Sequence, residues 1–132
     1  MKIVVLKFGG TSVGSVTKIK KVAEIIANYR KKNFNVIVVS SAMSGLTNDL
    51  ISKSQKICQN FSDSEHDVLV SSGEQVACSL IAGRLIHKGF KSRSWLAWQI
   101  PIFTEGDYKN SRINEIHKKK ILKKELRLQH VQ

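Results

Sequence analysis

A lysine and a pair of glycines stand close together near the start of the chain, in the stretch VLKFGGTSVG at residues 5–14. The glycines follow a short apolar run, which predicts a tight turn after a strand. A turn that leads into a helix presents free backbone N–H groups, and glycines allow an anion to approach them closely. Lys7 adds a positive charge, and Thr11 and Ser12 add hydroxyl donors. These residue types are the ingredients of a phosphate-binding turn.

The spacing of this motif sets limits on the interpretation. The P-loop pattern needs a lysine followed by Ser or Thr after its second glycine, and the dinucleotide-binding pattern needs GxGxxG; the stretch matches neither. A strand-to-helix turn can also require glycine for its backbone geometry alone. On spacing alone, an anion site and a purely structural turn both remain open.

Two strands and a helix are expected to position this turn. Ile3–Leu6 and residues 36–40 are apolar runs of the kind found in strands buried on both faces. Between them, an amphipathic helix is predicted over about 15–32 from apolar residues at helical spacing: Ile19, Val22, Ala23 and Ile26. This helix is long enough for a crossover connection, so residues 2–40 predict one β-α-β unit with parallel strands.

The next part of the chain predicts two more helices. After a polar turn at 41–49, apolar residues between Leu50 and Cys58 indicate a second helix. A polar loop is expected at 60–67. A third helical stripe runs from Val76 to Leu85 and ends near Gly89, a natural C-cap.

The last quarter of the chain predicts strands and then a basic helix. Strand-like pieces lie around Pro101, and a third parallel strand is considered near 91–96. A helix is expected over about 113–132, from its apolar residues Ile113, Ile116, Ile121, Leu122 and Leu126. With no internal repeat and no linker, the chain is interpreted as one α/β unit with a thin sheet, the first part of something larger.

Half of the net charge of +12 comes from the last part of the chain, because residues 109–132 hold eight Lys or Arg against two Glu. A basic segment can bind nucleic acid or another anion, but the interleaved aromatic residues of a single-strand binding surface are missing here. A solvated charged face is therefore favoured, and nucleic acid is not expected as a partner.

Composition places the chain among cytoplasmic proteins. It has 132 residues with no apolar run of eighteen, so no membrane span or membrane partner is expected, and Ile3–Leu6 is too short for a signal peptide. Cys58 and Cys78 have no metal-ligand spacing and no metal site is expected. Both are interpreted as small buried residues in a reducing compartment.

Four blocks of sequence, taken in order, resemble the aspartate kinases of the amino-acid kinase family. They are VLKFGGTSVGSVTKIKKVA at 5–23, VIVVSSAMSGLTNDL at 36–50, SSGEQVACSLIAGRL in the stretch from 71 to 85, and SWLAWQIPIFTEGDYKNSRI at 94–113. Kinases of the same fold that act on glutamate or acetylglutamate share the lysine and glycine turn but lack the third and fourth blocks. Independent motifs in the right order make the resemblance specific.

The resemblance implies a fold and a reaction. The fold would be a three-layer αβα arrangement with a mainly parallel sheet, of which this chain carries the N-terminal part of the catalytic domain. The reaction would transfer the γ-phosphoryl group of ATP, with Mg²⁺, to the side-chain carboxylate of L-aspartate. Its product is 4-phospho-L-aspartate, on the route to lysine, threonine and methionine. Phosphoryl transfer depends mainly on positioning and on stabilising charge.

The resemblance also assigns roles to residues of this chain. Lys7 would be catalytic, by neutralising charge on the phosphoryl group in flight. Nucleotide phosphates would be bound by the turn, that is by Lys7, Phe8, Gly9, Gly10 and Ser12. The substrate aspartate would be bound by Ser41, Thr47, Glu74 and Arg112, with Glu74 on its α-ammonium group and the Arg112 guanidinium on its α-carboxylate.

Each assignment has a plainer alternative. Lys7 can be a surface lysine at a strand end, Ser41 and Thr47 can be turn or cap residues, and Arg112 can be one more charge of the basic segment. Ser71 and Glu74 also match a capping box, which would start a helix without touching a ligand. Glu74 lies beside the apolar residues 77–78, where an unpaired carboxylate would be unfavourable, so the ligand role is preferred.

The chain departs from the family pattern in its last block and beyond it. Phe103 stands where an arginine precedes the threonine, and Lys109 stands where a glycine is usual. The family's glycine-rich GFQG turn, its later nucleotide-binding elements and its regulatory domains are expected to be absent from this sequence. The alternatives to a complete enzyme are therefore a truncated inactive remnant, one half of a split kinase that needs a C-terminal fragment or a homo-oligomer, or a basic protein that binds anions or RNA.

Overall fold

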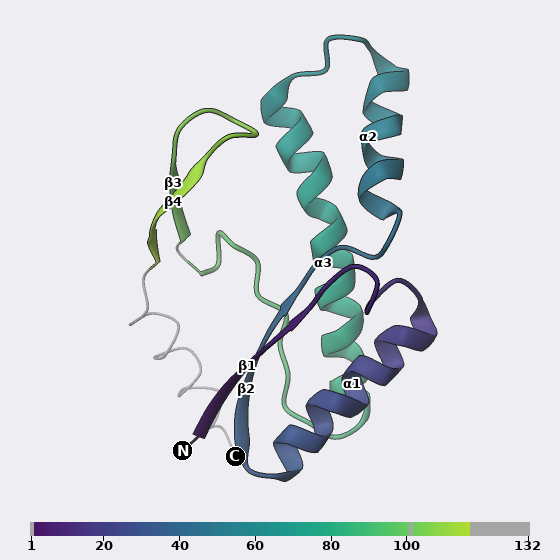
Figure 1. Cartoon of the computed structure of the whole chain (residues 1–132), viewed down its shortest axis with the longest axis vertical. Coiled ribbons are helices and arrows are strands. Elements are labelled where there is room, and N and C mark those ends of the chain that lie inside the picture. The colour runs from purple at the N-terminus through teal and green to yellow at the C-terminus, as the bar shows by residue number, and fades with distance from the viewer. Residues whose placement is uncertain (1, 101, 117–132) are drawn as a thin grey trace. The chain divides into compact units, whose positions relative to one another are not determined.

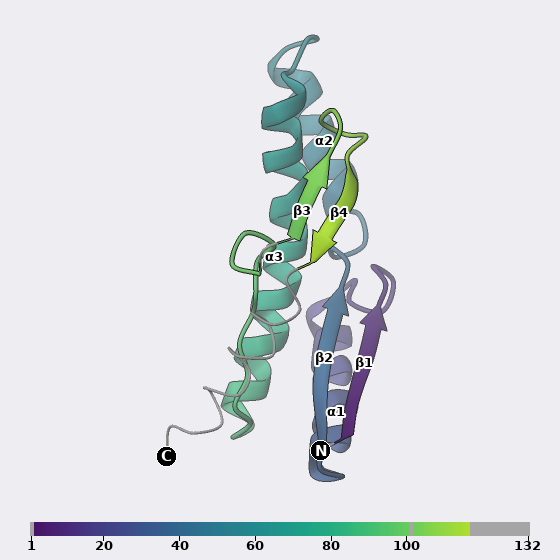
Figure 2. The same ribbon diagram turned by 90° about the vertical axis from the view of Figure 1, so that its left-hand side faces the viewer.

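Two parallel strands form the sheet of the first part of the chain in the computed structural model, which describes residues 2–100 and 102–116. Strand β1 (Lys2–Phe8) pairs with β2 (Phe34–Ser40) from Lys2↔Phe34 to Phe8↔Ser40 without a register shift. Helix α1 (Val16–Lys31) connects them. Figure 2 shows the two strands side by side and pointing the same way. The predicted parallel β-α-β unit is confirmed.

Helix α1 begins and ends where its sequence predicts. The Ser15 side chain accepts a hydrogen bond from the Lys18 backbone N–H at 3.2 Å, which satisfies one of the free donors of the first turn. Arg30 and Lys31 lie in the last turn, where positive charge suits the helix dipole. Asn33 then reverses the chain with φ of 60°, a left-handed conformation that Asn tolerates better than most residues.

Two helices follow β2 and lie side by side as a hairpin, α2 (Leu46–Ile57) and α3 (Asp63–His87) (Figure 1). Helix α3 is longer than predicted, because residues 63–67 belong to it and not to a polar loop. Asp63 and Glu65 place negative charge in its first turn, where the helix dipole favours it.

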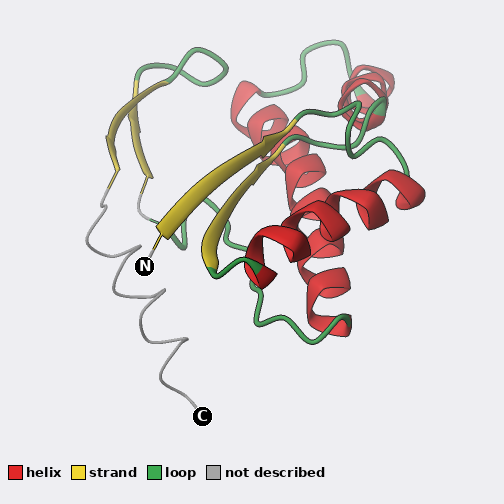
Figure 3. Ribbon diagram, turned by 60° about the horizontal axis from the view of Figure 1, so that its bottom comes forward, coloured by secondary structure: helices red, strands yellow, loops and turns green. Residues whose placement is uncertain are grey.

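In the first unit of the chain α1 and α3 lie on one side of the sheet (Figure 3), and the hydrophobic core lies between these helices and that face of the sheet. Leu6, Phe8, Val36 and Val38 pack from the strands against nine buried residues: Val13, Ile19, Val22, Ala23, Ile26, Ala27, Ala77, Ile81 and Leu85. The other face carries Ile3, Val5 and Val39, all substantially exposed. The prediction that both strands are buried on both faces is therefore wrong for the described residues. The α/β class with a parallel sheet is confirmed.

The second unit of the chain, residues 95–132, contains a β-hairpin in its described part. Strand β3 (Ile102–Glu105) pairs antiparallel with β4 (Arg112–Ile116), with a register shift between Phe103 and Thr104. Of the strand-like pieces expected around Pro101, the one after it is confirmed as β3, whereas residues 97–100 before it form a turn. The start of the expected basic helix is wrong, because residues 113–116 belong to β4, and the rest of that prediction, 117–132, lies outside the described residues. Residues 91–96, considered as a third parallel strand, form no strand.

None of the helices in the described ranges has the length and apolar character needed to cross a bilayer.

Cys58 is exposed at the end of α2 and Cys78 is half-buried in α3, so the expectation of two buried cysteines is wrong for Cys58. The residue is the C-cap of α2 and has an extended backbone conformation there.

Two isoleucines of α3 provide a test of this core. Ile81 is 3% exposed within the cluster, whereas Ile86 is 56% exposed. Ile81→Ala should lower the free energy of unfolding by about 2–5 kcal/mol, because it removes buried methylene groups and leaves a cavity. Ile86→Ala should change it by less than about 1 kcal/mol. Urea unfolding followed by far-UV circular dichroism measures both, and equal effects would contradict the assignment of this face of α3 to the core.

Candidate functional site

The turn after β1 and the loop after β2 meet at the carboxyl end of the sheet. The strands are parallel and in register, so Phe8 and Ser40 end side by side. The Ser41 N–H then donates to the Phe8 carbonyl oxygen at 3.0 Å, which holds the start of the loop against the end of β1. This edge of an open parallel sheet is where ligands of α/β proteins bind.

Glu74 joins α3 to this edge. Its Oε1 accepts a hydrogen bond from the Ala42 backbone N–H at 3.3 Å, across 32 residues of sequence. The side chain is half-buried, and its second oxygen has no hydrogen-bond partner among the described residues. Glu74 therefore reaches the loop after β2, as the ligand role requires.

The capping-box alternative for Glu74 is wrong. Ser71 lies inside α3, eight residues after its first residue, and its hydroxyl donates back to the Val68 carbonyl oxygen at 2.9 Å. A capping box needs its serine just before the first turn of a helix. The sequence pattern was present, but the helix had already begun.

Three glycines allow the turn, the loop and α3 to approach one another. A Cβ atom at Gly10 would lie 3.1 Å from the Ala42 carbonyl oxygen, and one at Gly14 would lie 3.0 Å from the Ser44 Cβ. A Cβ at Gly73 of α3 would lie 3.0 Å from the Ala42 Cβ. Each distance is shorter than ordinary van der Waals contact, so side chains at these positions would push the three segments apart.

The turn itself leaves donors free. Within it the Ser12 N–H donates to the Gly9 carbonyl oxygen at 2.9 Å, while the N–H groups of Gly10 and Thr11 have no hydrogen-bond partner among the described residues. The Lys18 Nζ donates to the Thr11 carbonyl oxygen at 2.9 Å. Lys18, in the first turn of α1, thus holds the glycine turn in place and adds a second positive charge beside it. Sequence reasoning did not find Lys18, and its exposed helical position gave no signal.

The predicted site residues divide into those that the structure joins and those that it does not. Gly10, Ser41 and Glu74 belong to one connected set of contacts around Ala42. Lys7 is exposed at the end of β1, on the sheet face opposite to Leu6 and Phe8. Thr47 lies half-buried in the first turn of α2. Neither side chain makes a hydrogen bond or an ion pair with any described residue.

Arg112 belongs to the other unit of the chain. It is the first residue of β4, is exposed, and pairs in register with Glu105 of β3. Its proposed role on the aspartate carboxylate remains a prediction from sequence.

Sequence reasoning also missed Ser44, whose Cβ packs toward Gly14, and Gly73. For Gly73 a signal was present, because a glycine inside a helical stripe often marks close backbone approach.

Comparison with known proteins identifies the family. Residues 2–127 match the Amino acid kinase family, and the chain belongs to it. It is similar to the aspartokinase of Rickettsia felis, with 43% identity over 119 residues, which cover 88% of this chain and 30% of that protein.

Two solved structures are similar to this chain in fold. The crystal structure of aspartate kinase from Synechocystis has a TM-score of 0.63 and 40% identity over 67% of this chain and 15% of that chain. The structure of E. coli aspartokinase III in complex with aspartate and ADP has a TM-score of 0.70 over 86% of this chain and 35% of that one, and its 18% identity supports the fold alone. The chain spans about 30% of the length of the curated relative from Rickettsia felis.

The glycine contact at α3 predicts opposite outcomes for two similar substitutions. Alanine stabilises an exposed helical glycine position by up to about 1 kcal/mol, and Gly83→Ala should show this gain because nothing lies within 4 Å of its Cβ. Gly73→Ala should not be stabilised in this way, because its Cβ would lie only 3.0 Å from the Ala42 Cβ. The same substitution should shift the Ala42 amide resonance. Thermal unfolding and amide NMR measure both effects; equal stabilisation with an unmoved Ala42 amide would show that α3 does not touch the loop there.

The environment of Cys78 predicts a change in its reactivity. Burial raises the pKa of the Cys78 thiol, and the negative charge of Glu74 raises it further. Glu74→Gln removes that charge, so the pKa should fall and alkylation by iodoacetamide at pH 8 should become about two- to threefold faster, as the thiolate fraction rises. The exposed Cys58 serves as an internal reference in the same protein. An unchanged ratio of the two rates would contradict the proximity of Glu74 to Cys78.

Proposed function

We propose that this chain supplies the aspartate-binding side and one phosphate-binding turn of an aspartate kinase. The reaction would transfer the terminal phosphoryl group of ATP to the side-chain carboxylate of L-aspartate and give 4-phospho-L-aspartate. The observation that carries the proposal is the hydrogen bond from Ala42 to Glu74, which brings α3 to the carboxyl ends of both strands. The 43% identity to an aspartokinase supports the choice of substrate.

The turn suits nucleotide phosphates. The N–H groups of Gly10 and Thr11 are unpaired among the described residues, and Gly10 has no room for a side chain. Lys7 and Lys18 bring positive charge, with Phe8, Gly9 and Ser12 completing the segment. Mg²⁺ bound with ATP would neutralise part of the charge on the phosphates.

The loop and α3 suit the amino acid. One oxygen of Glu74 is held by the Ala42 N–H, which leaves the other for the α-ammonium group of aspartate. Ser41 follows β2 directly and Thr47 stands in the first turn of α2, so both would donate to substrate oxygens. Arg112 would pair with the α-carboxylate through its guanidinium fork.

Lys7 would act on the phosphoryl group during transfer. It follows the apolar part of β1, directly before the glycine turn, and forms no ion pair with a described residue. An unpaired lysine at this edge stabilises negative charge that spreads over the transferring oxygens. Lys7→Ala should therefore lower turnover by about 10²- to 10³-fold wherever turnover is measured.

The length covered by this chain predicts that it needs more sequence for turnover. We propose that the 132 residues bind aspartate but do not phosphorylate it at a useful rate, since losing the position of one reactant forfeits up to about 7–11 kcal/mol of proximity. A split kinase, an inactive remnant and a piece of a longer kinase chain all fit this expectation.

A hydroxylamine assay tests the proposal, because it traps the acyl phosphate as a hydroxamate. The chain is given ATP, Mg²⁺ and L-aspartate, alone and with a separately produced segment of the Rickettsia felis aspartokinase that follows its matched region. No product alone and product with the added segment, lost in Lys7→Ala, would support a split kinase.

Three further outcomes separate the alternatives. No product in either case, with saturable aspartate binding that Glu74→Gln abolishes, would support the remnant. Turnover by the chain alone would contradict the need for more sequence. The absence of both turnover and aspartate binding would contradict the proposed function itself.

A further inference from the structure

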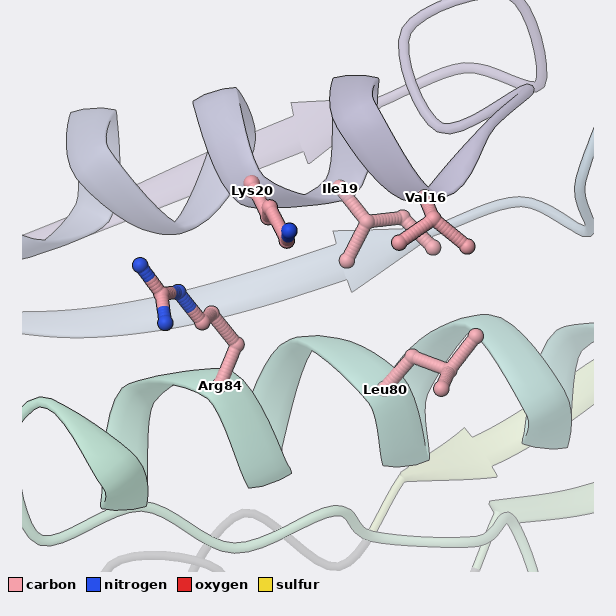
Figure 4. Close-up of a pocket in the computed structure, with 5 residues that line it drawn as sticks. All are labelled: Val16, Ile19, Lys20, Leu80 and Arg84. Atoms are coloured by element: carbon pink, nitrogen blue, oxygen red, sulfur yellow. The ribbon is translucent and has the colours of Figure 1, made fainter.

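A groove runs between α1 and α3, away from the turn and loop residues of the candidate site. Val16, Ile19 and Lys20 line it from α1, and Leu80 and Arg84 line it from α3 (Figure 4). Its volume is about 180 Å³. It shares no lining residue with the set of contacts around Ala42.

The groove has a cationic end and an apolar end. Figure 4 shows the Lys20 amine and the Arg84 guanidinium toward one end, and Val16, Ile19 and Leu80 toward the other. Val16 is 60% exposed and Leu80 is 43% exposed although they face a groove. A ligand that covers this apolar surface removes it from water, which favours binding.

The positive charge at the cationic end is only partly neutralised. Arg84 Nη2 lies 3.9 Å from Glu24 Oε1, at the limit of an ion pair, and its buried Nε has no hydrogen-bond acceptor. Both oxygens of Glu24 are held by the Lys88 ammonium group, at 2.6 and 2.7 Å. Lys20 forms no ion pair with any described residue. One shared carboxylate therefore serves Arg84 and Lys88, and none serves Lys20.

We propose that this groove binds a small amphiphilic monocarboxylate. Its carboxylate would pair with Lys20 and Arg84, and its aliphatic tail would cover Val16, Ile19 and Leu80. A cavity of about 150 Å³ holds a benzene-sized group, so a tail of about six carbons fits the groove. The ligand would bridge α1 and α3 and stabilise their packing.

Sodium hexanoate is the probe that tests this, used on the whole 132-residue chain. Acetate carries the same charge without the tail, and hexan-1-ol carries the tail without the charge. Methyl NMR of Val16, Ile19 and Leu80 should show saturable shifts with hexanoate, and both controls should bind at least about tenfold more weakly. Equal binding of either control, or no saturable shift with hexanoate, would overturn the proposal.

Matched variants locate the site on α1 and α3. Lys20→Gln and Leu80→Gln should each weaken hexanoate binding about five- to tenfold. Lys21→Gln changes the neighbouring exposed lysine, which does not line the groove, and should leave the affinity unchanged. Far-UV circular dichroism checks that each variant is folded. Folded Lys20→Gln protein with unchanged affinity would refute the groove as the binding site.

Discussion

The turn after β1, the loop after β2 and helix α3 meet at Ala42, because the turn and the helix each contribute a glycine there. The turn after β1 contributes Gly10, and α3 contributes Gly73, each with room for a hydrogen atom and little more. This close approach sets the position of α3 along the sheet edge. Glu74 is the next residue after Gly73, so the same approach determines where its carboxylate lies. The candidate site therefore depends on the absence of a side chain at Gly10 and Gly73 as well as on the Glu74 carboxylate.

The β-α-β unit could be predicted from the sequence because both of its signals are local. The apolar runs of β1 and β2 and the stripe of α1 repeat with the period of their own element. Helix α3 shows where such signals fail. Its first turns carry acidic and polar residues, and Val68 among them is exposed, so no apolar stripe marks the helix there. Packing against α2 and the charge at its first turn stabilise a helix that periodicity does not show.

Only the part of the candidate site that is local in sequence could be predicted. The glycine turn follows directly from the sequence, but the contact between Ala42 and Glu74 joins residues that only tertiary packing brings together. The hairpin of the second unit gives another example. Lys109 has φ of 65° in the turn before Arg112, a left-handed conformation that favours the glycine usual in the family pattern. The departure noted from sequence thus falls where the backbone is least suited to a lysine.

The long separation in sequence between α1 and α3 has a consequence for the order of folding. Strand pairing joins residues about thirty positions apart, from Lys2 to Phe34, whereas the ion pair between Glu24 and Lys88 spans 64 positions. Longer loops lose more entropy on closure, so the contacts between α1 and α3 should form after the β-α-β unit. The groove needs these contacts. Its ligand would therefore act on the last step of folding and slow the first step of local unfolding.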